Sequence, residues 1–173
     1  MNRTSKIDHG VSFLGTGSAA PKQLINNDQL GLRVDTSDSW IRSRTGICNR
    51  RVIGIEENLI DLSVSAALDA MKMAKWKEEE IDLLILATST PDDLFGSATK
   101  IQAKLGAKNA VAFDLTAACS GFLFALVTAA QYLRTGVMQK VLVIGADQLS
   151  RWVDWNDRKT CVLFGDGAGA LAI

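Results

Sequence analysis

The amino-acid sequence predicts an α/β fold in which helices cover both faces of a mixed, mainly parallel sheet. Five short apolar runs lack regular polar alternation, which is typical of strands buried on both faces. Helical patterns lie between these runs, and the order strand, helix, strand, helix, strand favours parallel pairing. At 173 residues the chain is long enough for one domain with a core of its own.

The predicted strands are the apolar runs Val11–Leu14, Leu83–Ala87, Ala110–Phe113, Val141–Ile144 and Cys161–Phe164. Apolar residues at helical spacing predict a first helix that ends near Ala74, with Asn58 as its N-cap. A second helix is expected over about Ser97–Leu105. The glycine-rich stretch 165–169 lacks the Lys-Ser/Thr of a phosphate loop, so it is predicted to form a tight turn.

A third helix, over about Ser120–Arg134, is apolar on nearly all sides through Ala130, so it is expected inside a larger body. The chain also stops at Ile173, just where an apolar strand begins. We therefore expect it to be one half of a longer protein. The uncharged run 115–133 is not predicted to span a membrane, because Gly121 and several polar residues interrupt it.

The composition argues against several functions. The 19 Lys and Arg residues balance the 19 Asp and Glu residues, so there is no overall positive field for nucleic acid or an anionic membrane. Three cysteines, one histidine and no C-x-x-C pair indicate neither a disulfide framework nor a metal site. The first twenty residues hold no long apolar run, so no secretory signal is predicted. We expect a cytoplasmic protein.

The strongest local signal is the segment 113–122, where an apolar strand passes through small residues into an apolar helix with Cys119 at the junction. A thiol at a helix N-terminus faces free backbone N–H groups, which favour the thiolate and can stabilise an oxyanion. From the residues alone, Cys119 is either a nucleophile or a small core residue. Cys48 and Cys161 are predicted to be unreactive, and His9 to be exposed rather than catalytic.

A second cluster follows Trp40, where no acidic residue occurs between Asp38 and Glu56. It contains four arginines: Arg42, Arg44, Arg50 and Arg51. Guanidinium groups bind phosphate in bidentate fashion and an indole stacks on a flat ring, so one interpretation is a site for an anionic ligand with a ring. The other is a solvated basic face with acidic partners elsewhere. The loop 150–160 again combines Arg with Trp.

Taken together, these segments resemble the β-ketoacyl-acyl-carrier-protein synthase III family of the thiolase superfamily along nearly the whole chain. The motifs are Gly15-Thr-Gly-Ser18 with Pro21, Thr36-Ser-Asp38 with Trp40-Ile, Arg44-Thr-Gly-Ile47, Ala87-Thr-Ser-Thr-Pro-Asp-Asp-Leu-Phe95, Ala117-Ala-Cys-Ser-Gly-Phe122 and Phe164-Gly-Asp-Gly-Ala-Gly-Ala170. The stretch Ser-Arg-Trp-Val-Asp-Trp from Ser150 is similar to the cyanobacterial and plastid branch. The resemblance implies that residues 1–173 are the N-terminal thiolase-like half of a pseudo-duplicated five-layer αβαβα sandwich.

The activity that the resemblance implies is an acyltransferase reaction that starts type II fatty-acid synthesis. Cys119 would take the acetyl group of acetyl-CoA. Malonyl-acyl-carrier protein would then lose CO2, and its carbanion would attack the thioester to give acetoacetyl-acyl-carrier protein. No cofactor is implied, because the CoA thioester is a substrate. The family's catalytic His and Asn belong to its second half, so the reaction would require that C-terminal half.

The resemblance also implies a set of substrate-binding residues. Trp40 and Arg158 would sandwich the CoA adenine, and Thr36 would contact the nucleotide. Arg44 and Thr45 would line the mouth that receives the pantetheine and the phosphates.

Phe95 would reach across a homodimer interface to form the floor of the partner's acyl pocket. Gly96, which follows it, stands where the family commonly has Pro. Two alternatives stay open: a related thiolase-superfamily condensing enzyme with another acyl starter, and a non-catalytic fragment that only binds a partner. A longer starter preference would favour the first, and an unreactive thiol the second.

Overall fold

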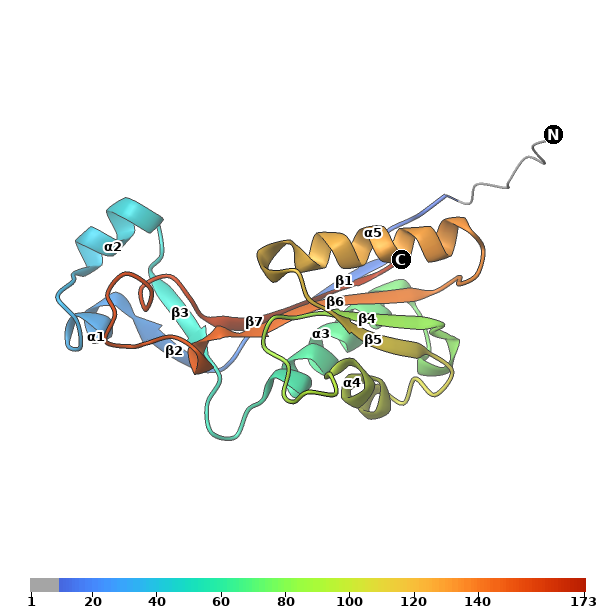
Figure 1. Ribbon diagram of the computed structural model, residues 1–173, viewed down its shortest axis with the longest axis horizontal. Helices are drawn as coiled ribbons and strands as arrows, with labels where there is room; N and C mark the ends of the chain where they lie inside the picture. Colours follow the sequence, from blue (N-terminus) through green and yellow to red (C-terminus); the bar gives the residue numbers. More distant parts are fainter. Residues whose placement is uncertain (1–9) are drawn as a thin grey trace.

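The computed structural model describes residues 10–173 as a large sheet between helices, with an arm at one end of the sheet (Figure 1). The sheet has the strand order β1-β7-β6-β4-β5. Its strands are β1 (Gly15–Ala19), β4 (Leu83–Ala87), β5 (Val111–Leu115), β6 (Val141–Gln148) and β7 (Asp166–Ala172). β4 pairs in parallel with β5 and β6, whereas β7 runs antiparallel between β6 and β1. The predicted mixed α/β sheet is therefore confirmed.

Helices cover both faces of this sheet. Helices α3 (Leu59–Ala74) and α4 (Ala98–Leu105) lie on one face and α5 (Gly121–Arg134) lies on the other (Figure 1). The side chain of Asn58 accepts a hydrogen bond from the N–H of Asp61 at 2.8 Å, which confirms the predicted N-cap. Each face has its own apolar core, and the two cores meet through the buried strands β4 and β6.

Two glycines of β1 let α3 cross this edge strand at very short range. A Cβ atom on Gly17 would lie 2.0 Å from the carbonyl oxygen of Ala66, and one on Gly15 would lie 2.1 Å from that of Ala70. No side chain fits in that space. The Gly-Thr-Gly-Ser motif therefore has a packing role at this edge.

The arm consists of short elements that lie beyond one end of the sheet (Figure 1). They are β2 (Gln23–Asn26), α1 (Asn27–Gly31), α2 (Asp38–Thr45), β3 (Asn49–Val52) and the 3-10 turn η3 (Leu149–Arg151). The rest of the segment between β6 and β7, to which η3 belongs, is also part of the arm. A third small core formed by Leu30, Ile41, Cys161 and Val162 holds them together. The sequence does not predict these elements, because runs of three to eight residues with mixed polarity carry too little periodicity.

Three sequence predictions are wrong in detail. Residues 11–14 do not form a strand, and only the N–H of Leu14 joins the ladder, at 2.9 Å from the carbonyl of Ala172. Residues 161–164 form no strand, and 161–163 lie in a turn, because Cys161 and Val162 face the core of the arm rather than the sheet. The glycine-rich stretch 165–169 enters β7 instead of turning, since ladder hydrogen bonds to β1 and β6 need no side chains.

The outer face of α5 is apolar and exposed in the part of the chain that the structure describes. Leu123, Phe124 and Val127 expose 63%, 58% and 59% of their surface. Exposed apolar surface of this extent on one helix indicates a surface that another element covers. In the same part of the chain, the helices fall short of the length and apolar character that crossing a membrane requires.

Candidate active site

Cys119 lies where β5 passes into α5, at the end of the sheet that carries the arm (Figure 1). It is exposed and belongs to a single 3-10 turn, η2 (Ala118–Ser120), which leads directly into α5. The Cys119 side chain is thus presented at the carboxyl end of a parallel strand and the amino end of a helix. The sequence prediction of a strand-turn-helix junction is confirmed.

The backbone at this junction adopts an uncommon conformation. Ala118 has φ +48°, in the left-handed region that favours glycine. A non-glycine residue there costs about 1 kcal/mol and persists only where the surroundings enforce it. The conformation makes the turn sharp, and it places Cys119 at the wall of a cavity.

The cavity beside Cys119 has a volume of about 270 Å³. Apart from Cys119, Phe122 and Asp147, its walls are glycine and alanine: Ala87, Ala118, Gly145, Ala146, Gly165, Gly167, Ala168 and Gly169. Small side chains leave room next to the sulfur, so an acyl group can reach it. The small residues that the sequence places around Cys119 are joined here by those of β6 and β7, far away along the chain.

Asp147 is a cavity residue that the sequence analysis missed. Its Oδ1 accepts hydrogen bonds from the N–H of Ser89 at 2.7 Å and from the hydroxyls of Thr88 and Thr90 at 3.3 Å each. Asp147 therefore ties the loop after β4 to the end of β6. A polar residue at the carboxyl end of a buried parallel strand was the signal in the sequence, because ligand sites gather at that edge.

Trp40 contacts two of the predicted binding residues. The guanidinium carbon of Arg158 lies 4.7 Å from the centre of the indole ring, and that of Arg44 lies 5.0 Å from it. Both distances are those of cation–π contacts. Arg158 also donates to the carbonyl oxygen of Asp35 at 2.8 Å. The structure thus brings the two Arg-Trp segments of the sequence together on the arm.

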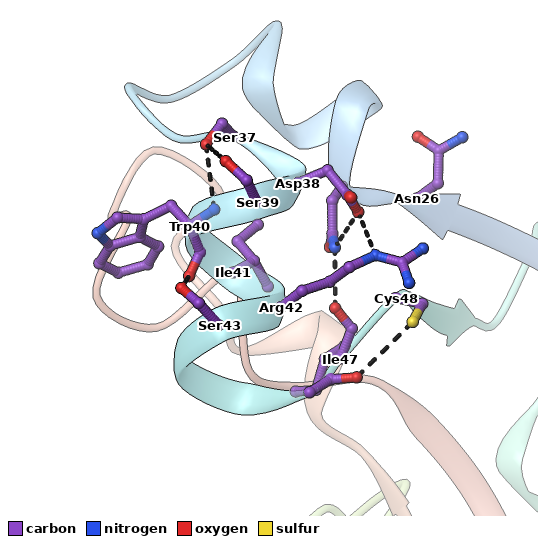
Figure 2. Close-up of polar contacts among 12 residues, drawn as sticks. Asn26, Ser37, Asp38, Ser39, Trp40, Ile41, Arg42, Ser43, Ile47 and Cys48 are labelled. Atoms are coloured by element: carbon purple, nitrogen blue, oxygen red, sulfur yellow. Dashed lines mark hydrogen bonds and ion pairs between the residues drawn. The ribbon is translucent and has the colours of Figure 1, made fainter.

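Three of the four arginines predicted as an anion cluster have other partners. Arg42 donates to Asp38 at 2.9 Å, on the side of α2 opposite Trp40 (Figure 2). Arg50 is buried, and Arg51 donates to backbone carbonyls at 3.1 and 3.2 Å. Of these three, only Arg42 has a countercharge, Asp38, whereas Arg50 and Arg51 bond to uncharged oxygen atoms of Asn27 and of the backbone. Three of the four guanidinium groups are therefore engaged within the protein, and the two interpretations of the cluster stay open only for Arg44. Arg44 alone remains beside Trp40.

The two predicted threonines have hydroxyl groups turned to the protein. Thr45 donates to the carbonyl of Ile41 at 2.8 Å and accepts from the N–H of Ile47 at 3.0 Å, so it secures the end of α2. The hydroxyl oxygen of Thr36 is buried without a hydrogen-bond partner in residues 10–173. Thr36 therefore retains its hydroxyl donor, whereas the O–H of Thr45 is already bonded to Ile41.

Phe95 lies apart from the Cys119 cavity. It is 91% exposed and lines a separate hollow of about 630 Å³ beside the edge strand β5, together with Leu94 and Asp114. Gly96 has φ +84°, which proline cannot adopt, so this loop has a conformation that a Pro at 96 would exclude. The carboxylate of Asp114 accepts hydrogen bonds from the N–H groups of Ser97 and Ala98, which hold in place the end of the loop that follows Gly96.

Cys48 and Cys161 do not line the cavity. Cys161 is fully buried, and burial raises the pKa of its thiol, which agrees with the prediction that it is unreactive. Cys48 lies on the arm, where its thiol is near the carbonyl of Gly46 at 3.7 Å. His9 lies outside the described residues. Within residues 10–173, no three His, Cys, Asp or Glu side chains are grouped in a way that could hold a metal ion.

Known proteins match both the sequence and the fold. The family model described as 3-oxoacyl-[acyl-carrier-protein (ACP)] synthase III matches residues 113–173. A protein of Prochlorococcus marinus (strain NATL2A) named beta-ketoacyl-[acyl-carrier-protein] synthase III is 70% identical over 173 residues, which are 100% of this chain and 51% of that protein. The chain thus spans about half the length of the curated relatives it matches.

Two crystal structures extend the comparison. The 3-oxoacyl-[acyl-carrier-protein] synthase III of Aquifex aeolicus VF5 is 49% identical with a TM-score of 0.92, over 94% of this chain and 53% of that one. The priming β-ketosynthase of the R1128 polyketide pathway is 37% identical with a TM-score of 0.90, over 92% of this chain and 48% of that one.

The mixed sheet between helices and the cysteine at a strand-turn-helix junction define a thiolase-like α/β protein. In sequence and in fold, the chain corresponds to the N-terminal half of the β-ketoacyl-[acyl-carrier-protein] synthase III family, with relatives in cyanobacteria. The resemblance that the motifs indicate is therefore confirmed.

Proposed function

We propose that this chain supplies the nucleophile and the CoA-binding arm of an enzyme that starts type II fatty-acid synthesis. The observation that carries the proposal is the exposed Cys119, held by the left-handed Ala118 at the wall of a cavity lined by small residues. The likeness to synthase III proteins supports the same activity. The chain acts together with a C-terminal half that brings the family's His and Asn.

The reaction has two stages. The Cys119 thiolate attacks the carbonyl carbon of acetyl-CoA, the carbon–sulfur bond to CoA breaks, and CoA leaves as a thiolate that takes up a proton. In the second stage, malonyl-acyl-carrier protein loses CO2, and the electron pair of the broken carbon–carbon bond forms an enolate. The enolate attacks the acetyl-Cys119 carbonyl, which releases acetoacetyl-acyl-carrier protein and restores the Cys119 thiolate.

CoA is proposed to bind at the arm. Trp40 offers an aromatic face to the adenine, and Arg158 lies on the other side of it once its contact with Trp40 opens. Arg44 and Thr45 line the mouth for the phosphates and the pantetheine, and the buried hydroxyl of Thr36 has capacity for the nucleotide. No cofactor is needed, because CoA carries the acyl group as a substrate.

Two protein surfaces are proposed to be covered in the working enzyme. The exposed apolar face of α5 suits the C-terminal half. Phe95, 91% exposed beside the edge strand β5, suits a homodimer in which it closes the acyl pocket of the partner. We place the reaction in the cytoplasm, with malonyl-acyl-carrier protein as the second substrate and without nucleic-acid or membrane partners.

A second candidate is a related condensing enzyme with a different acyl starter. The likeness to a priming β-ketosynthase of a polyketide pathway favours keeping this candidate. The two candidates differ in the acyl-CoA that modifies Cys119. A series from acetyl-CoA to longer acyl-CoAs therefore distinguishes them.

The test uses this chain joined to the C-terminal half of the Prochlorococcus marinus relative, here called the joined protein. After incubation with acetyl-CoA, denaturing intact-mass measurement is expected to show one added acetyl group, lost in Cys119→Ser. With malonyl-acyl-carrier protein, acetoacetyl-acyl-carrier protein is expected. If the intact relative is acetylated in parallel and the joined protein is not, the chain is a non-catalytic binding fragment and the proposal fails.

A further inference from the structure

Arg50 is a buried cation without an ion pair in residues 10–173. Only 5% of its surface is exposed, and the partners of its guanidinium are an amide and two backbone carbonyls. Burial lowers the pKa of this group from its ordinary value, because the charged form loses hydration. Arginine nevertheless stays charged at neutral pH. Burying such a charge costs free energy of folding, so we expect Arg50 to have a specific role.

The hydrogen bonds of Arg50 join β3, which carries it, to two other segments of the arm, residues 25–27 and the segment at Val162. Nη2 donates to Oδ1 of Asn27 at 2.9 Å and to the carbonyl of Val162 at 3.1 Å, while Nη1 lies 3.4 Å from the carbonyl of Ile25. β2 and α1 are thereby fastened to the segment 158–162. Arg158 lies in this segment, four residues before Val162.

Asn27 extends the connection to α2. It is 1% exposed, and its amide nitrogen donates to Oδ1 of Asp38 at 2.9 Å and to the carbonyl of Ile47 at 2.8 Å. These two contacts hold the first residue of α2 and Ile47, which lies two residues beyond the end of the helix. Trp40 and Arg44 project from this helix. The chain of contacts therefore runs from the Arg158 segment through Arg50 and Asn27 to the Trp40 helix.

We propose that Arg50, through Asn27, is a positioning residue that sets the distance between Trp40 and Arg158 and so shapes the nucleotide site of the arm. The inference rests on the proposed function, because it assumes that CoA binds between these two side chains. Arg50 itself does not touch the ligand. It acts by fixing α2 and the segment 158–162 against each other.

An arginine suits this role better than a lysine. The planar guanidinium donates in several fixed directions at once, and three acceptors surround it here. An ammonium group at the end of a flexible stem reaches fewer of these acceptors in fixed geometry. Arg50→Lys therefore keeps the charge and loosens the connection.

The experiment compares Arg50→Lys with Arg51→Lys in the joined protein. Arg51 is the matched control, because it is an exposed neighbour whose hydrogen bonds within residues 10–173 go to backbone carbonyls. We expect Arg50→Lys to raise the Kd for CoA and the KM for acetyl-CoA about tenfold, the effect of losing one buried hydrogen bond. The kcat and the rate of Cys119 alkylation by iodoacetamide are expected to stay within twofold of the unmodified protein, and Arg51→Lys to change none of these quantities.

Asn27→Ala is a second variant for the case in which Arg50→Lys does not fold. It retains the Arg50 side chain and its bonds to Val162 and Ile25 but removes both the Arg50–Asn27 hydrogen bond and the connection from Asn27 to α2, so the same rise in Kd with unchanged alkylation is expected. The inference is overturned if a folded variant binds CoA with unchanged Kd, or if kcat and alkylation fall along with CoA binding. The proposed function fails separately if the joined protein without substitutions does not bind CoA.

Discussion

The guanidinium carbon of Arg158 lies 4.7 Å from the centre of the Trp40 ring, so these two side chains stack directly on each other. That distance is a contact distance, and a planar ring does not fit between the two groups without a movement. Arg158 is the partner free to move, because Trp40 is carried by α2. Binding of an adenine would replace the contact between Trp40 and Arg158 by two contacts, one between the adenine and each of these side chains. The cost is that the hydrogen bond from Arg158 to Asp35 opens.

Arg158→Ala in the joined protein is expected to weaken CoA binding by about 1–2 kcal/mol, or roughly 5- to 30-fold, because one stacking partner of the adenine is lost. Cys119 alkylation by a small reagent is expected to stay unchanged. Isothermal titration with CoA measures the effect. Arg151→Ala is the control, since Arg151 lies in the same segment and donates to Gln148. Equal affinities for CoA in the two variants would contradict the assignment.

Cys119→Ser is expected to abolish acetylation, because a serine hydroxyl is a far weaker nucleophile than a thiolate when no base activates it. The fold is expected to stay intact to within about 0.5 kcal/mol, since Cys119 is exposed. Intact mass after acetyl-CoA and the urea midpoint check both statements. Cys48→Ser is the matched control and should retain full acetylation; acetylation that survives Cys119→Ser would refute the role.

Gly17→Ala is expected to destabilise the fold by about 3 kcal/mol or more, because the added Cβ would lie 2.0 Å from the backbone oxygen of Ala66. Backbone on α3 must then move away from β1. Urea unfolding followed by circular dichroism measures the change. At Gly10, where a Cβ would meet no atom within 4 Å, the same substitution should have little effect. Similar midpoints for the two variants would rule out the close approach.

The carboxyl group of Asp38 is expected to titrate below its ordinary value of 3.8, because its hydrogen bonds from Arg42 and then from Asn27 lower its pKa. Since the pKa is lower in the folded state, these contacts stabilise the arm above the pKa of the unfolded chain. Their contribution is lost as the pH falls through the folded pKa. Carboxyl NMR titration measures the value, and Arg42→Gln should raise it. An unchanged titration curve in that variant would disprove the contact.

Phe95→Asp is expected to weaken the proposed homodimer by at least about 2 kcal/mol, because a carboxylate would have to be buried in an apolar interface. Sedimentation velocity over a concentration series of the joined protein measures the dimer. Leu32→Asp is the control, since Leu32 is an equally exposed apolar residue, at 88%, on the arm. If both variants stay dimeric to the same dilution, Phe95 is not an interface residue.

The long elements could be predicted from the sequence because their signals are local. The N-cap Asn58 and the apolar spacing that follows it delimit α3 within the chain segment itself. The run Leu83–Ala87 is apolar throughout, and it forms a strand with the same bounds. The junction at Cys119 was visible for the same reason, since a strand, a turn and a helix follow one another without interruption.

The arm could not be predicted, because its elements are stabilised by residues that are distant in sequence. Cys161 and Val162 look like part of a sheet strand, but they complete a small core with Leu30 and Ile41. Arg50 looks like one more exposed cation, but it turns inward to Val162. Neither outcome is encoded in the neighbouring residues.

The sequence by itself thus determined the α/β class, the family resemblance and the place of Cys119 at a strand-turn-helix junction, since these depend on periodicity, capping and short contiguous motifs. Only the tertiary structure decided which arginines of the cluster are bound to other parts of the protein, that Arg158 contacts Trp40, and that Asp147 borders the Cys119 cavity. The physical reason is that a side chain's partners are chosen by proximity in space. Burial and hydrogen-bond geometry then select, among chemically similar residues, which ones face a ligand and which ones hold the fold together.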